Sequence, residues 1–132
     1  MQTEFIDNDY LNNVVLLLKQ DGFVLDFIKD NDNVLLTISK DGLSYRSMIK
    51  KHMASAELAE KIVTTMSFLM KRFNAKCEEY RMKCEDYLEF TKRYPSVRQL
   101  QNQIQKTASK LNVLRLTWYA RRRAEYDKTR KR

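Results

Sequence analysis

The sequence predicts a mainly α-helical protein with an α+β region at its N-terminus, and three observations support this fold class. The chain of 132 residues contains only two glycines and one proline, so it has few of the residues that tight turns require. Long stretches carry apolar residues three and four positions apart, which is the helical period. Two short apolar runs near residue 30 are instead separated by a cluster of turn-forming residues. We therefore expect a short helix and a β-hairpin, followed by a long antiparallel helical hairpin of the coiled-coil type.

The first expected element is a short amphipathic helix. Residues 7–9 (Asp-Asn-Asp) are typical helix N-caps, and the apolar residues of segment 10–18 follow helical spacing. Asp21-Gly22 is a stop signal, because glycine readily adopts the left-handed conformation that ends helices.

A β-hairpin is expected next. Residues 23–28 and 34–38 are apolar runs of strand length, and Asp-Asn-Asp-Asn at residues 30–33 forms a turn cluster between them. Segment 43–53 is ambiguous, because the preceding Asp41-Gly42 favours a hairpin turn and hence a third strand. We adopt the alternative of a helix, which the spacing of apolar residues favours. These residues are Tyr45, Met48, Ile49, His52 and Met53.

Residues 55–94 are expected to form one long helix, because neither glycine nor proline occurs between Ala54 and Tyr94. One apolar stripe follows this segment at steps of three and four. It consists of Leu58, Ile62, Met66, Leu69, Phe73, Cys77, Tyr80, Cys84, Tyr87 and Thr91. A helix of this length reaches about 60 Å and needs a partner to cover the stripe.

Pro95 ends that helix, and Pro95 or Ser96 begins the next. A heptad seam follows at alternating steps of three and four. It consists of Val97, Leu100, Ile104, Thr107, Leu111, Leu114 and Trp118. With only a turn between them, the two helices are expected to fold back antiparallel and cover each other. Each could instead pair with another chain, and both are long enough that we expect a homo-oligomer as well. The expected division is a module at 1–53 and a hairpin at 54–132.

The charge is concentrated at one end. The formal net charge is +8, yet residues 1–50 hold five basic and eight acidic residues, a net of −3. Residues 51–132 carry a net of +11, and the stretch from Arg98 onward holds eleven basic and two acidic residues. This asymmetry is typical of a polyanion-binding end joined to a different module. The acidic N-terminal module is expected to contact a protein partner or to cap the bundle.

The basic end predicts a nucleic-acid interface without sequence specificity. Cationic side chains neutralise phosphates, and exposed aromatic rings stack on unpaired bases. The candidates are Arg98, Lys106, Lys110, Arg115, Tyr119, Arg121, Arg122, Arg123, Tyr126, Lys128, Arg130, Lys131 and Arg132. Tyr119 and Tyr126 are the stacking candidates, because Trp118 completes the seam and is expected in the core. The alternative is a solvated helix face that ends in a charged tail.

Other binding classes compete with nucleic acid. An acidic membrane surface ranks lower, because the apolar face is needed for the seam, and no segment has the length of a membrane span. Residues 128–132 resemble a short nuclear import signal, so the expected location is cytoplasmic, or nuclear in a eukaryote. The second function is a helical adaptor or inhibitor that binds a protein partner through the hairpin. An adaptable methionine groove would serve it, with core filling as the default role of these residues. They are Met48, Met53, Met66 and Met70.

Enzymatic chemistry is not expected, and neither a metal nor a cofactor is predicted. His52 is the only histidine, and no nucleophile is placed beside it. Cys77 and Cys84 are seven residues apart, which is about 10 Å along one helix and too far for a disulfide. We expect both thiols on a buried helix face, with an intersubunit contact as the alternative. The strand segments also lack the acid-x-Lys pattern of one nuclease class, because Ile38 and Phe27 stand where an acid is needed.

Overall fold

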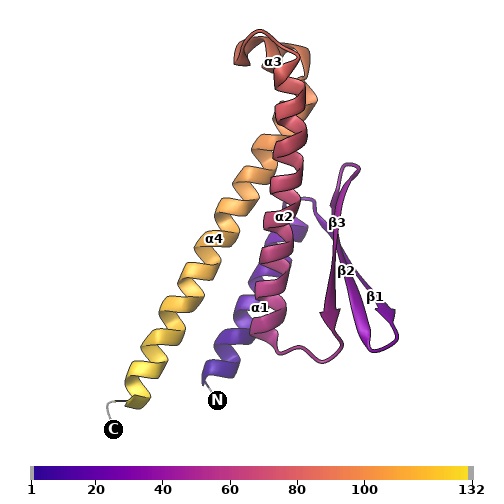
Figure 1. Ribbon diagram of the computed structural model, residues 1–132. Coiled ribbons are helices and arrows are strands. Elements are labelled where there is room, and N and C mark those ends of the chain that lie inside the picture. The colour runs from indigo at the N-terminus through magenta and orange to yellow at the C-terminus, as the bar shows by residue number, and fades with distance from the viewer. Residues whose placement is uncertain (1, 131–132) are drawn as a thin grey trace.

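The computed structural model describes the chain from residue 2 to residue 130, and its side chains from residue 4 to residue 129. Within these residues the order is α1 (Gln2–Gln20), β1 (Val24–Asp30), β2 (Asn33–Lys40), β3 (Leu43–Lys50), α2 (Ser55–Met82), α3 (Tyr87–Arg93) and α4 (Pro95–Arg130). Figure 1 shows α2 and α4 as two long helices that meet near α3 and diverge below it. The helix α1 lies beside their lower parts, and the sheet lies on one side of α2. The mainly α class with an α+β N-terminal region is therefore confirmed, and so is the helical hairpin.

The boundaries of α1 differ from the prediction at one end and agree at the other. The helix begins at Gln2, so the predicted capping role of residues 7–9 is wrong. These residues lie inside the helix, where the two carboxylates bind α4 instead. At the other end Gly22 adopts a φ of +87°, and the N–H of Phe23 donates to the carbonyl of Leu18 at 2.8 Å. This is a Schellman cap, which glycine forms without strain.

The sheet is an antiparallel meander in the order β1-β2-β3. The predicted hairpin of β1 and β2 is confirmed, with Asp30 opposite Asn33 beside the turn. The helix predicted for 43–53 is wrong, because residues 43–50 form the strand β3. Asp41 and Gly42 have φ values of +50° and +85°, and this two-residue turn sends the chain straight back along β2. Pairing with β2 then overrides the helical spacing of the segment.

The single helix predicted for residues 55–94 is also wrong, because the chain leaves the helix after Met82 and re-enters it at Tyr87. Asp86 is the N-cap of α3, and its carboxylate accepts a hydrogen bond from the N–H of Glu89 at 2.7 Å. The side chain of Glu89 accepts in return from the N–H of Glu85 at 2.7 Å. These local bonds satisfy backbone donors that an unbroken helix would satisfy internally. The prediction that the last helix begins at Pro95 is confirmed.

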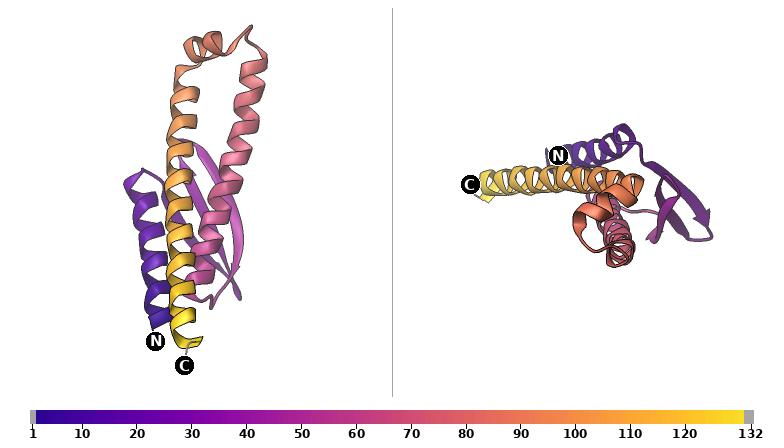
Figure 2. Two further views of the ribbon diagram at one scale, coloured as in Figure 1. Left: turned by 90° about the vertical axis from the view of Figure 1, so that its left-hand side faces the viewer. Right: turned by 90° about the horizontal axis from the view of Figure 1, so that it is seen from above.

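One hydrophobic cluster runs through the molecule and includes buried residues from every helix and from β2 and β3, while the half-buried Leu25 of β1 packs against it. All seven seam residues of α4 are buried or half-buried, as predicted. Both predicted modules, 1–53 and 54–132, contribute to this cluster, and the boundary between them stays a prediction. One face of the sheet packs against the helices, while Figure 2 shows that no helix covers its other face.

Candidate nucleic-acid interface on α4

The candidate residues lie along one continuous helix. In α4 no carboxylate occurs before Glu125, whereas nine lysines and arginines are distributed from Arg98 to Arg130. The helix has 36 residues, which corresponds to a length of about 54 Å. The candidates therefore fall into three groups along α4, namely one at the tip near α3, several in the middle, and several at the base near the end of the helix. The side chain of Arg130, together with Lys131 and Arg132, lies outside the described residues.

Arg98 is separated from the other candidates. Its guanidinium lies over the ring of Tyr87 at 5.1 Å from the ring centre, and it donates a hydrogen bond to Asn102. The distance along α4 from Arg98 to Tyr119 is about 30 Å at the helical rise per residue. The structure therefore does not bring Arg98 together with the basic residues of the base.

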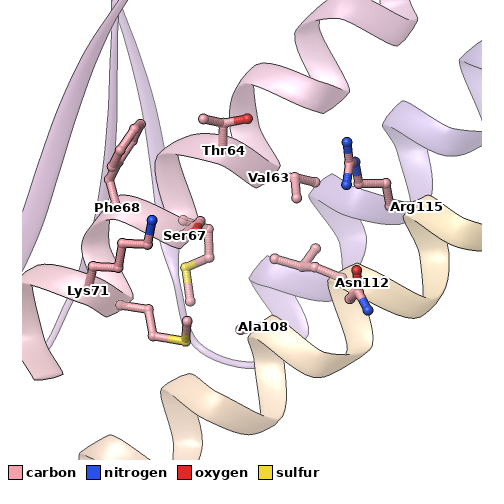
Figure 3. A pocket seen from close by; sticks show the side chains of 11 residues that line it. Val63, Thr64, Ser67, Phe68, Lys71, Ala108, Asn112 and Arg115 are labelled. Carbon is pink, nitrogen blue, oxygen red and sulfur yellow. The ribbon is translucent and has the colours of Figure 1, made fainter.

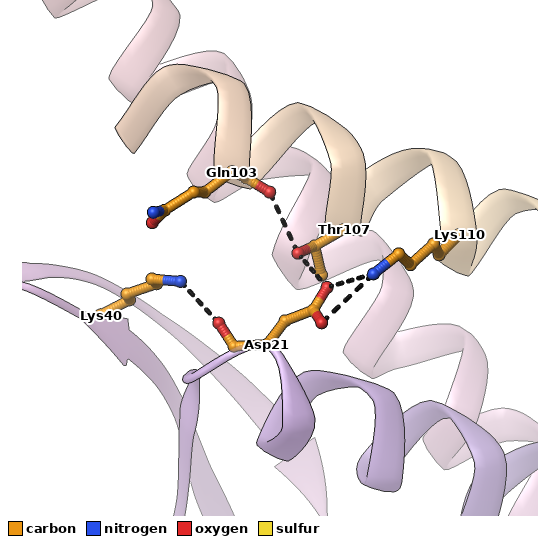
Figure 4. Close-up of polar contacts among 5 residues, drawn as sticks. All are labelled: Asp21, Lys40, Gln103, Thr107 and Lys110. Atoms are coloured by element: carbon orange, nitrogen blue, oxygen red, sulfur yellow. Dashed lines mark hydrogen bonds and ion pairs between the residues drawn. The ribbon is translucent and has the colours of Figure 1, made fainter. Parts of the chain in front are cut away.

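In the middle of α4, Lys110 binds an acidic residue at the end of α1. Lys110 Nζ lies 3.3 Å from each carboxylate oxygen of Asp21, and the Thr107 hydroxyl donates a hydrogen bond to Asp21 Oδ2 at 2.6 Å (Figure 4). Lys40 Nζ donates to the Asp21 backbone carbonyl at 2.5 Å. The hydrogen bond from Thr107 and the charge of Lys110 lower the pKa of Asp21 below its usual value. Asp21 thus joins α1, β2 and α4, and Lys110 is used in that junction.

Arg115 and Tyr119 converge on a second carboxylate, that of Glu60 in α2. Arg115 Nε lies 3.1 and 2.9 Å from the two oxygens of Glu60, and the Tyr119 hydroxyl donates to one of them at 2.8 Å. Tyr10 of α1 donates to the other oxygen at 3.3 Å. Burial, with the adjacent Glu60 charge, raises the pKa of Tyr10, and the hydrogen bond to Glu60 raises the pKa of Arg115. Glu60 thus links α1, α2 and α4.

At the base of α4 the carboxylates come from α1. Trp118 is buried as predicted and donates its Nε1–H to Asp7 at 2.8 Å. Asp7 also lies 3.9 Å from Arg122, whose guanidinium lies 5.1 Å from the centre of the Trp118 ring. Arg121 lies 3.7 Å from Asp9. The acidic first helix therefore lies directly against the basic last helix.

Four described candidates remain more open. Arg123 and Lys106 are exposed and form no ion pair within the described part of the chain. Tyr126 has 63% of its surface exposed, and Lys128 pairs only with its neighbour Glu125 at 3.8 Å. Tyr119, Arg123 and Tyr126 are spaced at i, i+4 and i+7, so they lie on one side of α4. Tyr119 is itself 45% exposed despite its hydrogen bond to Glu60.

The residues that sequence reasoning misses are the four carboxylates of the N-terminal half of the chain that bind the candidates, namely Asp7, Asp9, Asp21 and Glu60. Sequence patterns predict caps at Asp7 and Asp9 and a helix stop at Asp21, and they do not single out Glu60. No local pattern identifies the binding role of these residues, because each acts on a residue more than 50 positions away. The one available signal is the opposite net charge of the two ends of the chain.

A groove lies between α2 and α4. It encloses about 420 Å³, and its apolar lining includes Met66 and Met70 of α2 and Leu111 of α4. Figure 3 shows Lys71 and Arg115 at this groove, with the small side chain of Ala108 on α4. Met66 is fully buried and belongs to the core, whereas Met70 is only half-buried.

The remaining candidates for chemistry are dispersed. In the part of the chain that the structure describes, no group of three or more His, Cys, Asp or Glu side chains is placed to hold a metal ion. Cys77 is buried, with a pKa raised by burial, whereas Cys84 lies in the break between α2 and α3, and both thiols are free. Among the described helices, none has the length and apolar character that crossing a bilayer demands.

Comparison of the chain with protein-family models, curated proteins and solved structures found no match.

Proposed function

We propose that the protein binds nucleic acid, without sequence specificity, through the base of α4. The observation that carries this proposal is the row formed by Tyr119, Arg123 and Tyr126. The rings of Tyr119 and Tyr126 are exposed there, whereas the neighbouring Trp118 is buried in the core. An exposed cation stands between them, and it has no ion-pair partner among the described residues. The sequence adds Arg130, Lys131 and Arg132 beyond them.

The proposed binding combines two interactions. Arg123, Lys128 and the terminal cations neutralise phosphates and release counterions, which makes the affinity fall steeply with salt. The rings of Tyr126 and Tyr119 stack on unpaired bases. This stacking does not depend on sequence, because every base has a π-face. Binding of this kind favours single-stranded over double-stranded nucleic acid, because the bases of a duplex are already stacked.

The cations that pair with α1 and α2 play a smaller part in the proposal. Lys110 and Arg115 contact Asp21 and Glu60, so a phosphate would have to replace a carboxylate at each of them. Arg121 and Arg122 are held more loosely, at 3.7 and 3.9 Å from their carboxylates. Exposed pairs of this length contribute about 0–1 kcal/mol, so these two arginines are the first that a phosphate would recruit.

The test is a titration of the full-length protein with a fluorescent oligothymidine of about 20 nucleotides and with a duplex of the same length. We expect affinity for both probes at about 50 mM salt and a loss of at least tenfold at about 200 mM. The variant in which Arg123, Lys128, Arg130, Lys131 and Arg132 become glutamine should bind at least tenfold more weakly. The variant Tyr126→Ala should weaken binding of the single strand and leave the duplex nearly unchanged, since stacking contributes about 1–3 kcal/mol per base.

The matched control removes five cations elsewhere. It uses five exposed cations of α2 and α3, namely Lys71, Arg72, Lys76, Lys92 and Arg93. Their replacement by glutamine changes the net charge by the same amount. We expect less than a threefold loss for this control. Equal losses of affinity in the two variants with five substitutions would contradict a localised interface. Absence of nucleic-acid binding at the lower salt concentration would contradict the proposed function.

The groove between α2 and α4 favours a second candidate function, the binding of a protein helix. Apolar side chains make up most of its lining, with a few neutral polar ones such as Ser67 between them, and its charged residues, Lys71 and Arg115, are both basic. No carboxylate occurs on α4 between Pro95 and Ala124. The occupant of this groove would therefore be an amphipathic helix with acidic residues beside its apolar stripe.

A labelled peptide tests this second function by fluorescence anisotropy. A helical peptide with a leucine stripe flanked by glutamates should bind the protein, whereas the same peptide with lysines in place of the glutamates should not. The variant Ala108→Trp fills the groove and should abolish peptide binding while nucleic-acid affinity is kept. Equal binding of both peptides, or binding unaffected by the tryptophan, would contradict the charge-complementary groove.

A further inference from the structure

The uncovered face of the sheet carries an ordered pattern of side chains. Because side chains alternate between the two faces of a strand, the register assigns twelve residues to the outer face. They form four rows across β1, β2 and β3, namely Val24–Ser39–Ser44, Asp26–Thr37–Arg46, Ile28–Leu35–Met48 and Asp30–Asn33–Lys50. The outer face is thus acidic along β1, apolar at one row across its middle, and basic along β3.

No helix among the described residues packs on this face. The outward residues of β3 are all exposed, while its inward residues are half-buried or buried. Ile28 and Met48 expose 56% and 50% of their surfaces. Within the part of the chain that the structure describes, Asp26 and Arg46 form no ion pair, and neither do Asp30 and Lys50. An apolar row framed by unpaired charges of opposite sign is typical of an interaction surface.

The pattern is complementary to itself. Consider a second copy stacked on this face through a two-fold axis parallel to the strands and centred on β2. That rotation places β1 of one copy over β3 of the other and keeps each row over its own row. Asp26 then meets Arg46 of the second copy, Asp30 meets Lys50, and Ile28 meets Met48. The central Leu35 meets its own equivalent.

The alternative orientation is unfavourable. A two-fold axis in the same plane but perpendicular to the strands places β1 over β1 and β3 over β3. Acidic residues would then face the acidic strand of the other copy and basic residues its basic strand, and this like-charge repulsion disfavours that orientation. The charges therefore select one of the two ways in which the faces can stack.

We propose that the outer face of the sheet is the surface through which two copies of this chain associate as a β-sandwich dimer. Stacked sheets lie about 10 Å apart with strands within about 30° of one another, so Asp26 and Arg46 of different copies can reach each other. Twelve residues per copy are fewer than the roughly 20–30 of a standard interface. Interfaces below the standard size belong to weak, reversible associations, so we expect the dimer to have a Kd of about micromolar magnitude, the weak end of the range for standard interfaces. Its surface contains none of the α4 residues proposed to bind nucleic acid.

Exchange of charges between β1 and β3 tests the proposal on the full-length protein. By sedimentation velocity at about 100 μM, well above the expected Kd, the wild type should have twice the 15.8 kDa mass of one chain. Asp26→Arg and Arg46→Asp should each raise the Kd by at least about tenfold, because each places like charges opposite each other at two positions.

An equimolar mixture of the two variants should regain the dimer. The arginine introduced at position 26 of one chain then faces the aspartate introduced at position 46 of the other. The native Arg46 of the first chain likewise faces the native Asp26 of the second, so both positions regain opposite charges. Recovery of the dimer would also exclude misfolding as the reason why each variant alone is monomeric, because misfolded chains would not associate when mixed.

Lys29→Asp is the matched control, since Lys29 is exposed on the same edge strand but on the opposite face. It should leave the Kd within about threefold of the wild type. A monomeric wild type would overturn the proposal. So would a dimer that Arg46→Asp leaves intact, an equal loss in Lys29→Asp, or a mixture that stays monomeric.

Discussion

The two ends of the helical hairpin differ in what covers them. At the base of the hairpin, which includes the middle of α4, the helix lies against both α1 and α2 from Ile104 to Trp118, and its seam is buried there except at the half-buried Leu114. At the tip, Val97 and Leu100 of α4 are only half-buried, and Tyr80 and Met82 at the end of α2 are exposed. Of the elements that the structure describes, α3 lies against the tip, whereas α1 and the sheet lie against the base.

This difference shows what a third helix contributes. Where α1 lies against α4, it supplies carboxylate partners to Lys110, Arg121 and Arg122, and the aromatic pair Tyr10–Trp118 stacks at 4.7 Å between ring centres. Beyond α1, most polar contacts of the tip are local, such as the cap of α3 by Asp86, and the hydrogen bond from Gln101 to Asn74 joins α4 to α2. The hairpin therefore combines a stable base, held by contacts distant in sequence, with a tip held largely by contacts between near neighbours.

Trp118→Ala should lower the free energy of unfolding more than the other substitutions, because it removes the ring that joins α1 to α4. We expect a loss of about 3–5 kcal/mol in the free energy of unfolding, as for other buried aromatic truncations. Leu100→Ala, on the same seam but half-buried near the tip, should cost about 1 kcal/mol. Urea denaturation followed by far-UV circular dichroism measures both values. Equal losses at the two positions would remove the distinction between base and tip.

Asp21→Asn should have an intermediate effect at the upper edge of the base. It keeps an acceptor for Thr107 but removes the charge opposite Lys110, and hydrogen bonds to charged groups contribute about 1.5–3 kcal/mol. Because folding lowers the pKa of Asp21, the stabilisation is complete above the pKa of the unfolded chain. It is lost as the pH falls through the lower pKa of the folded protein. The stability difference between wild type and Asp21→Asn, measured by urea denaturation, should therefore shrink on acidification from neutral pH, and a constant difference would contradict the role of the charge.

Asp86→Ala should have the smallest effect on global stability. The cap that it removes contributes about 1 kcal/mol, and that loss should be confined to the tip. Native-state hydrogen exchange should show faster exchange of the amides of α3, with the amides of α1 and of α4 around Leu111 unchanged. A uniform acceleration through all helices would show that the tip and the base unfold as one unit.

Features encoded by neighbouring residues can be predicted from the sequence. Gly22 and Pro95 mark real helix boundaries, because the left-handed φ of one and the ring of the other act within a single turn. The seam of α4 is predictable for the same reason, since helical spacing alone determines which residues share a face. The break at residues 83–86 is not, because it contains neither glycine nor proline and is made by the side chains of Asp86 and Glu89.

Features encoded by distant residues cannot be predicted in this way. Segment 43–50 has apolar residues at helical spacing although the preceding Asp41-Gly42 favours a strand, and its pairing with β2, such as Val34 opposite Ile49, decides for the strand. The basic candidates on α4 are visible in the sequence as a cluster, but their partition into paired and open cations depends on carboxylates of α1 and α2. The interface is therefore proposed only at the base of α4, where the side chains of Arg123 and Tyr126 are exposed.

The antiparallel packing of α1 and α4 also determines how the molecule would respond to a pulling force. Residues 2 and 130 lie at the same end of the bundle (Figure 1). Force applied between these two points loads the α1–α4 contact in an unzipping direction rather than in shear. The contacts would open in sequence, with the Arg121–Asp9 and Arg122–Asp7 pairs first and the Lys110–Asp21 pair last. Each step then resists only one or two contacts at a time, so the protein should yield at low force from its termini while the α2 side of the hairpin stays folded.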